Sequence, residues 1–181
     1  MTSSQREQEP IVLENSELGR LEFNWSGDRF AHSWTFGETQ FQSVESSSEE
    51  AWPLSPPLQQ IHSQSFADGR EIIFGVGMAG RGHWSASFTL VPELRCWIVE
   101  LACRCTVDTG PLSCCYQLPE TNGEAQLQDG VLSLSTAPTT LLEPIAPGTE
   151  LEIKDGQVML CPRENSTEGE TIQWAYRIRI V

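Results

Sequence analysis

The residues with the clearest potential for chemistry lie in one glycine-rich segment, Gly75-Val-Gly-Met-Ala-Gly-Arg-Gly82, and in the strand expected after it. Glycines allow backbone N–H groups to approach a ligand closely. Arg81 offers five donors suited to a carboxylate or phosphate, and His83 can exchange a proton near neutral pH. Trp84 and Ser85 follow directly. The segment predicts a binding site for a small polar ligand; the alternative is a structural role, since glycines inside strands are also typical of close backbone packing.

This segment matches neither of the common nucleotide-binding patterns. The spacing Gly77-x-x-Gly80-x-Gly82 differs from the dinucleotide fingerprint, and no helix is expected after it to bind a phosphate at its N-terminus. A P-loop needs Lys and then Ser or Thr after its last glycine, and both are missing here. We therefore predict no cofactor.

Two charged residues on a second strand extend the candidate site. In residues 95–107 apolar side chains occupy the odd positions, which leaves Glu100 and Arg104 on the more polar face. If this face is buried, Glu100 is expected to form an ion pair with Arg104 or Arg81. If it borders a cleft, Glu100 is the carboxylate best placed for acid–base chemistry with His83. The candidate ligand-binding set is Arg81, His83, Trp84, Ser85, Glu100 and Arg104.

The histidines and cysteines do not predict a metal site. His32, His62 and His83 lack the short spacings of zinc ligands, and the cysteines occur as Cys-x-Cys and Cys-Cys rather than CxxC. Cys103 and Cys105 share a face with apolar neighbours, so we expect buried, unreactive thiols. Because we expect no export signal, the six cysteines do not predict disulfides.

The elements that must position these residues are strands. Hydrophobic side chains alternate with a period close to two along most of the chain, and Asp68-Gly69 and Asp155-Gly156 are typical of tight hairpins. We predict an all-β fold, a two-sheet antiparallel β-sandwich of about ten to twelve strands with little or no helix. Only residues 11–18 and 120–128 could form a helical turn or two. The row from Trp97 to Cys105, with Trp84 and Phe88, is expected in the core.

The chain is predicted to form a single domain over residues 11–181. Residues 1–10 are expected to be a disordered tail, because they are polar and lack an apolar pattern. Residues 43–57 are rich in serine, glutamate and proline, which predicts a long surface loop.

Charge and composition narrow the partners. The formal net charge is −14, from 25 acidic and 11 basic residues, so a broad grip on nucleic acid or on an anionic membrane is not expected. Neither a signal peptide nor a membrane-spanning run is evident, which predicts a cytoplasmic location. Six tryptophans favour a module that binds a carbohydrate-like ligand or a protein partner. The alternatives are a carbohydrate-active enzyme using Glu100 and His83, and an assembly protein; the oligomeric state is left open.

Overall fold

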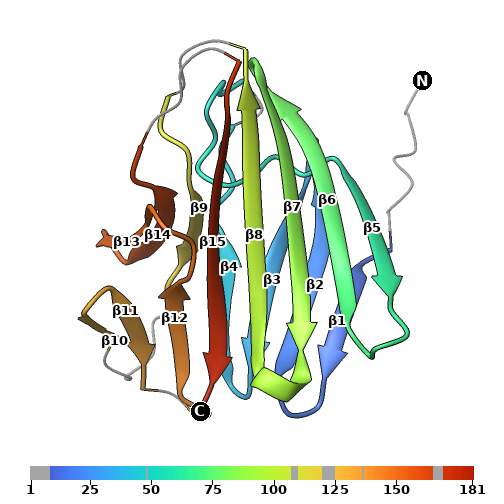
Figure 1. Ribbon diagram of the computed structural model, residues 1–181, viewed down its shortest axis with the longest axis vertical. Coiled ribbons are helices and arrows are strands. Elements are labelled where there is room, and N and C mark those ends of the chain that lie inside the picture. Colours follow the sequence, from blue (N-terminus) through green and yellow to red (C-terminus); the bar gives the residue numbers. More distant parts are fainter. Residues whose placement is uncertain (1–8, 48, 107–109, 120–124, 136, 165–168) are drawn as a thin grey trace.

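The protein is a sandwich of two antiparallel sheets (Figure 1). The computed structural model describes residues 9–47, 49–106, 110–119, 125–135, 137–164 and 169–181. Strands make up 63% of the structure and helix 2%, which confirms the predicted all-β antiparallel sandwich. Except for Glu9 and Pro10, the predicted N-terminal tail lies outside the described residues.

The first sheet has seven strands. In spatial order they are β1 (Ile11–Asn15), β2 (Gly19–Ser26), β3 (Arg29–Phe36), β4 (Thr39–Ser43), β9 (Cys114–Gln117), β14 (Gln157–Pro162) and β13 (Thr149–Lys154). The second sheet has eight strands. In spatial order they are β10 (Ala125–Gln128), β11 (Val131–Leu134), β12 (Thr140–Pro144), β15 (Thr171–Ile180), β8 (Cys96–Cys105), β7 (Gly82–Val91), β6 (Glu71–Ala79) and β5 (Gln60–Ser65).

The described residues contain more strands than the sequence predicted, fifteen in place of ten to twelve. The two segments that could have formed helical turns contain β1 and β10 instead. Both are short strands that pair with the next strand along the chain, so pairing within a hairpin outweighs an ambiguous local pattern. The one helix described is a 3₁₀ turn, Pro92–Leu94, between β7 and β8. No described helix has the length and apolar character to cross a bilayer.

A single hydrophobic cluster includes side chains from both sheets. The predicted core row on β8 is confirmed: Trp97, Val99, Leu101, Cys103 and Cys105 are all buried. Trp34 of the first sheet meets Trp97 of the second edge to face, with ring centroids 5.1 Å apart. This contact places large aromatic rings at the middle of the interface between the sheets.

The connection between β4 and β5 enters the molecule, although a surface loop was expected there. Its first part is largely exposed, but Pro53 and the run from Ser55 to Leu58 are buried. This run lies against the inner face of β6, where the strand has glycines. A Cβ atom added at Gly77 would lie 1.7 Å from the carbonyl oxygen of Pro57, and one at Gly75 would lie 2.9 Å from Leu58 Cδ1. The glycines therefore make room for the incoming backbone.

We expect Gly77→Ala to destabilise the fold strongly. The new methyl group must displace the backbone at Pro57, and overpacking of this kind typically costs about 1–3 kcal/mol or more. Urea unfolding monitored by tryptophan fluorescence measures the change in the free energy of unfolding. Ser85→Ala, at an exposed site on the neighbouring strand, is the control and should change it little. Equal effects of the two substitutions would contradict the packing role assigned to Gly77.

Candidate functional site

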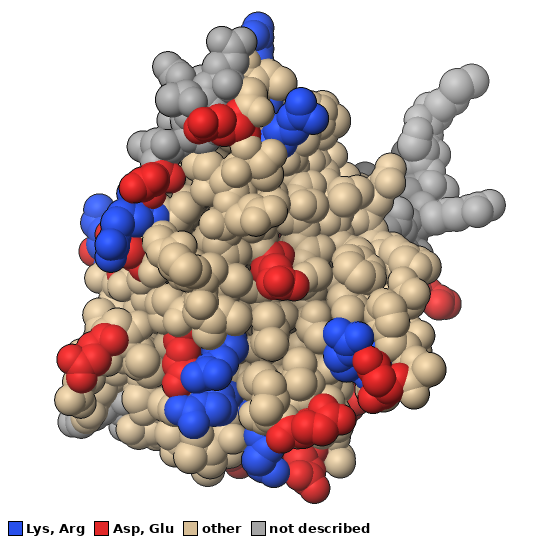
Figure 2. Space-filling view, viewed as in Figure 1, with Lys and Arg blue, Asp and Glu red and all other residues tan. Residues whose placement is uncertain are grey.

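The candidate site lies on the outer face of the eight-stranded sheet. Alternation along β7 directs Trp84, Ala86 and Phe88 into the core and leaves His83 and Ser85 exposed on the other side. Glu100 and Arg104 on β8 are exposed on this same outer face. Figure 2 shows the face as a broad surface of uncharged side chains, with acidic and basic groups gathered mainly towards its rim.

The centre of this face contains a shallow hollow of about 270 Å³ over β6, β7, β8 and β15. Ser87 donates a hydrogen bond from Oγ to Oε2 of Glu100 at 3.0 Å, which orients the carboxylate beside the hollow. Phe74 on β6 pairs with Ser87 in the strand register and has 37% of its surface exposed. An apolar ring, a hydroxyl and a carboxylate thus line one surface. The full lining is Phe74, Ser85, Ala86, Ser87, Glu100, Leu101, Ala102 and Gln173.

A second hollow of about 350 Å³ adjoins the first over β5, β6 and β7. Its lining includes Val76, Met78 and His83 together with Gln59, Gln60, Gly77 and Trp84. His83 pairs with Arg104 across β7 and β8, and Arg81 lies at the turn just before β7. The two arginines give this end of the face a basic character.

The structure divides the predicted site residues into separate groups. Ser85 and Glu100 line the central hollow, whereas His83, Arg104 and Arg81 belong to the basic end. Glu100 pairs with Ser87, four residues along β7 from His83, so their backbones lie roughly 13 Å apart. Within the part of the chain that the structure describes, no hydrogen bond joins the Glu100 carboxylate to His83, and the two side chains line different hollows. Among the described residues Glu100 forms no ion pair with Arg81 or Arg104, and its carboxylate accepts the hydrogen bond from Ser87.

Trp84 has a different environment from the rest of the predicted set. Its side chain is only 2% exposed, and its ring packs edge to face against Trp174 with centroids 6.0 Å apart. It therefore belongs to the core, as its alternation with His83 and Ser85 also indicates. It can support the floor of the second hollow but does not offer a ring to solvent.

Phe74 and Gln173 are site residues that the sequence reasoning missed. The apolar residues of β6, Ile72 to Met78, alternate with Gly75 and Gly77 and could have been placed on either face. Gly75 and Gly77 were the available signal for which face of β6 is buried, because the run Ser55 to Leu58 can pack inside the strand only where these residues are small. The larger side chains of β6 then point outward. Gln173 joins the site through its register with Ala102 on β8, which is a long-range pairing.

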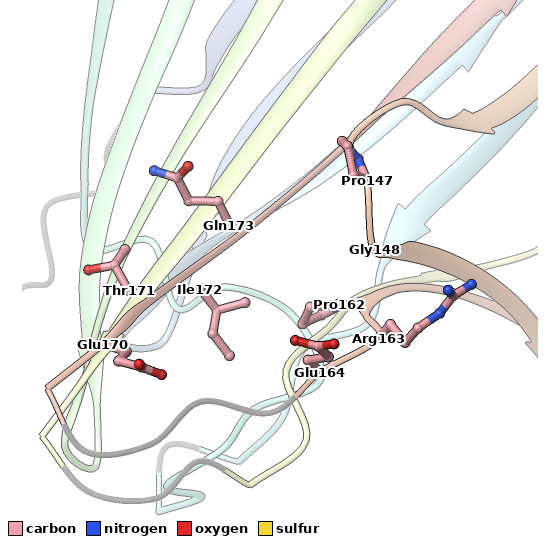
Figure 3. Close-up of a pocket in the computed structure, with 9 residues that line it drawn as sticks. All are labelled: Pro147, Gly148, Pro162, Arg163, Glu164, Glu170, Thr171, Ile172 and Gln173. Carbon is pink, nitrogen blue, oxygen red and sulfur yellow. The ribbon is translucent and has the colours of Figure 1, made fainter.

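Another hollow, of about 740 Å³, lies at the start of β15, near the end of β14 and the β12–β13 connection (Figure 3). Glu164, Glu170 and Ile172 are among its lining residues, and Arg163 donates to Glu150 at 2.7 Å. None of the predicted site residues lies there. Residues 165–168, next to Glu164 in the chain, lie outside the described residues, so this volume does not define a ligand.

The three histidines do not converge. His62 and His83 are exposed on the outer face, whereas His32 is buried between the sheets. No group of histidine, cysteine, aspartate or glutamate side chains in the described ranges could hold a metal ion. His32 Nε2 instead lies 2.8 Å from the hydroxyl of Tyr116. Burial lowers the pKa of His32 to about 3, so the ring stays neutral and serves as a hydrogen-bonding core residue.

The cysteines behave as buried small side chains. All six are free thiols, and five of them are fully buried. Burial raises the pKa of the Cys114 thiol to about 12 and that of Cys115 to about 11, which keeps both protonated. Burial also raises the pKa of Cys103. Thiols in this state are poor nucleophiles, in agreement with the expected unreactive role.

Glu45, a half-buried carboxyl group, follows β4. Its Oε1 accepts a hydrogen bond from Ser43 Oγ at 2.7 Å, while Oε2 is buried and has no partner among the described residues. Burial raises the pKa of Glu45 to about 7, and the nearby charge of Arg29 only partly offsets this. Glu45 borders none of the hollows described above. We assign it a structural role, with Arg29 and Asp28 as the charged groups around it.

Comparison with known proteins leaves the geometry as the guide to function. No protein-family model matches the chain, and no curated protein sequence matches it.

We expect Glu45→Gln to remove part of the pH dependence of stability. The folded protein keeps Glu45 protonated up to about pH 7, whereas the unfolded chain releases that proton above about pH 4.5. The stability that protonated Glu45 contributes is fully present below the pKa of the unfolded chain. It is lost as the pH rises through the pKa of the folded protein. Between about pH 4.5 and about pH 7 the free energy of unfolding of the wild type should therefore fall by up to about 3 kcal/mol relative to that of the variant.

Urea unfolding of both proteins at about pH 5 and about pH 8 measures this difference. The contribution of His32 is common to both proteins and cancels. A difference in unfolding free energy that does not change with pH would show that Glu45 ionises normally.

Proposed function

We propose that this protein is a binding module that recognises a carbohydrate-like ligand on the outer face of the eight-stranded sheet. The observation that carries the proposal is the central hollow, where the exposed ring of Phe74 lies on the strand next to Ser87, which orients Glu100. A sugar has an apolar C–H face that packs on a ring and hydroxyl groups that donate to carboxylates. Few, well-oriented polar groups beside an apolar surface are typical of ligand sites.

The surroundings of the hollow support a neutral or weakly charged polar ligand. Ser85 and Gln173 add a hydroxyl and an amide, which can both donate and accept hydrogen bonds. The adjoining hollow contributes exposed apolar side chains, Val76 and Met78. Together the two hollows cross the sheet from β5 to β15, which is long enough for an extended ligand.

The enzyme alternative receives less support. Glycoside hydrolysis normally needs two carboxyl groups about 5–9.5 Å apart. Glu100 is the single acidic residue among those lining the two hollows, and among the described residues no hydrogen bond joins it to His83. Binding without turnover is therefore the function that this geometry favours. A protein ligand on the same face is the alternative occupant, and a cytoplasmic location stays a prediction that the six free thiols support.

We expect Glu100→Gln and Phe74→Ala each to weaken oligosaccharide binding at least tenfold. Loss of a hydrogen bond to a charged group costs about 1.5–3 kcal/mol, and each 1.4 kcal/mol is a factor of about ten in affinity. The measurement is a panel of neutral and uronic-acid oligosaccharides screened by thermal shift, followed by calorimetric titration of any hit.

Two substitutions away from the face serve as matched controls. Glu152→Gln removes a carboxylate from exposed β13, and Leu94→Ala removes an exposed apolar side chain from the 3₁₀ turn. Both should leave the affinity unchanged. Absence of binding at about 10 mM oligosaccharide, or binding that neither Glu100→Gln nor Phe74→Ala weakens, would rule out this site.

A further inference from the structure

One edge of the eight-stranded sheet lacks the features that normally keep sheet edges from pairing. Proteins protect exposed edges with charges, prolines, bulges or very short strands. Among the described residues the edge strands are β1, β13, β10 and β5. β1 carries Glu14, β13 carries two glutamates and Lys154, and β10 has only four residues. β5, with the sequence Gln-Ile-His-Ser-Gln-Ser, has six residues and neither a charge nor a proline.

The backbone of β5 presents hydrogen-bonding groups to the open side. The N–H of Phe66 donates to the carbonyl of Arg70 at 2.8 Å, which makes these two residues a hydrogen-bonded pair at the end of the β5–β6 ladder. Such pairs alternate along antiparallel strands. The residues of β5 bonded to β6 are then Gln60, His62 and Gln64. The residues whose N–H and C=O groups face away from β6 are Ile61, Ser63 and Ser65.

We propose that β5 pairs antiparallel with β5 of a second copy of this chain, about a two-fold axis at Ser63. In this register Ser63 faces the same residue of the second copy, and Ile61 faces Ser65. The pairing forms about six backbone hydrogen bonds and joins two eight-stranded sheets into one continuous sheet. The interface is isologous, because the same strand serves both copies.

The absence of charged side chains on β5 favours a second copy of this chain as the strand that pairs with it. The chain has a net charge of −14, so most surfaces of two copies repel each other. Like charges directly opposite each other destabilise a strand pair. Residues 59–67 contain no charged residue, so β5 meets its own copy without opposing like charges. Self-pairing of β13 would instead bring glutamates together.

The hollow beside this edge adds apolar surface to the interface. It measures about 190 Å³ and lies between β1 and β5–β6, with Val12, Leu13, Ile72 and Ile73 among its lining residues. Val12 is 39% exposed. One charged residue, Glu71, also lines it. Two-fold pairing at β5 brings this edge of both sandwiches together and removes part of the apolar surface from water.

The test is the mass of the full chain in solution as a function of concentration. We expect light scattering to show a rise from 20.2 kDa towards twice that value as the concentration increases from micromolar to millimolar. Hydrogen exchange read by NMR should show that the amides of Ile61, Ser63 and Ser65 become protected in the dimer. The amides of His62 and Gln64 are bonded to β6 and should be protected at every concentration. A mass of 20.2 kDa throughout would overturn the proposal.

Two substitutions locate the interface. Ser63→Lys places two ammonium groups opposite each other at the two-fold axis. Ser63→Pro removes a backbone N–H that does not bond to β6. Each substitution should raise the dimer dissociation constant at least tenfold. Gln128→Lys makes the same charge change on β10, at the opposite edge of this sheet, and should leave the dimer dissociation constant unchanged. Unfolding curves of dilute samples check that each variant folds. A dimer insensitive to both Ser63 substitutions would place the contact elsewhere and overturn the proposal. The test uses no sugar, so it is independent of the ligand proposed above.

Discussion

A buried chain of hydrogen bonds ties the two sheets together. His32 of β3 contacts the hydroxyl of Tyr116 on β9, and that hydroxyl bonds to Tyr176 on β15, in the opposite sheet. Burial lowers the pKa of His32 and raises the pKa of both tyrosines, so every member stays neutral. Buried polar groups must be satisfied by partners. The sheets can therefore pack in few relative positions, and β15 holds β8 and its outer face in place.

A second constraint acts on the strands that form the candidate site. Because the run Ser55 to Leu58 occupies the space inside β6, that strand can carry only glycine at positions 75 and 77 of its inner face. Its larger apolar residues, including Phe74, Val76 and Met78, are then directed to solvent. The exposed apolar surface is thus a consequence of how the loop is buried. Such surface is costly to leave in water and commonly marks an interaction site.

The sequence is informative where a residue's alternation determines its face and less so where distant segments meet. Alternation along β7 and β8 placed Trp97 in the core and left Glu100 and His83 outside, as the structure has them. The same pattern could not say which face of β6 is buried, because that depends on Pro57, about twenty residues earlier in the chain. Nor could it place Glu100 relative to His83, since that distance depends on the register between strands.

Electrostatics narrows the class of ligand that this face can accept. Seven of the nine described arginines form ion pairs, and Arg81 and Arg104, both at the basic end of the face, form none with another described residue. A polyanion would experience the repulsion of a chain with net charge −14. Screening at physiological salt limits that repulsion to about 8 Å, so an anionic group near Arg104 would be attracted locally. Glu100, roughly 13 Å along the strands, favours hydroxyl donors instead. The ligand that we propose for this face is therefore extended and hydroxyl-rich, with at most one anionic end.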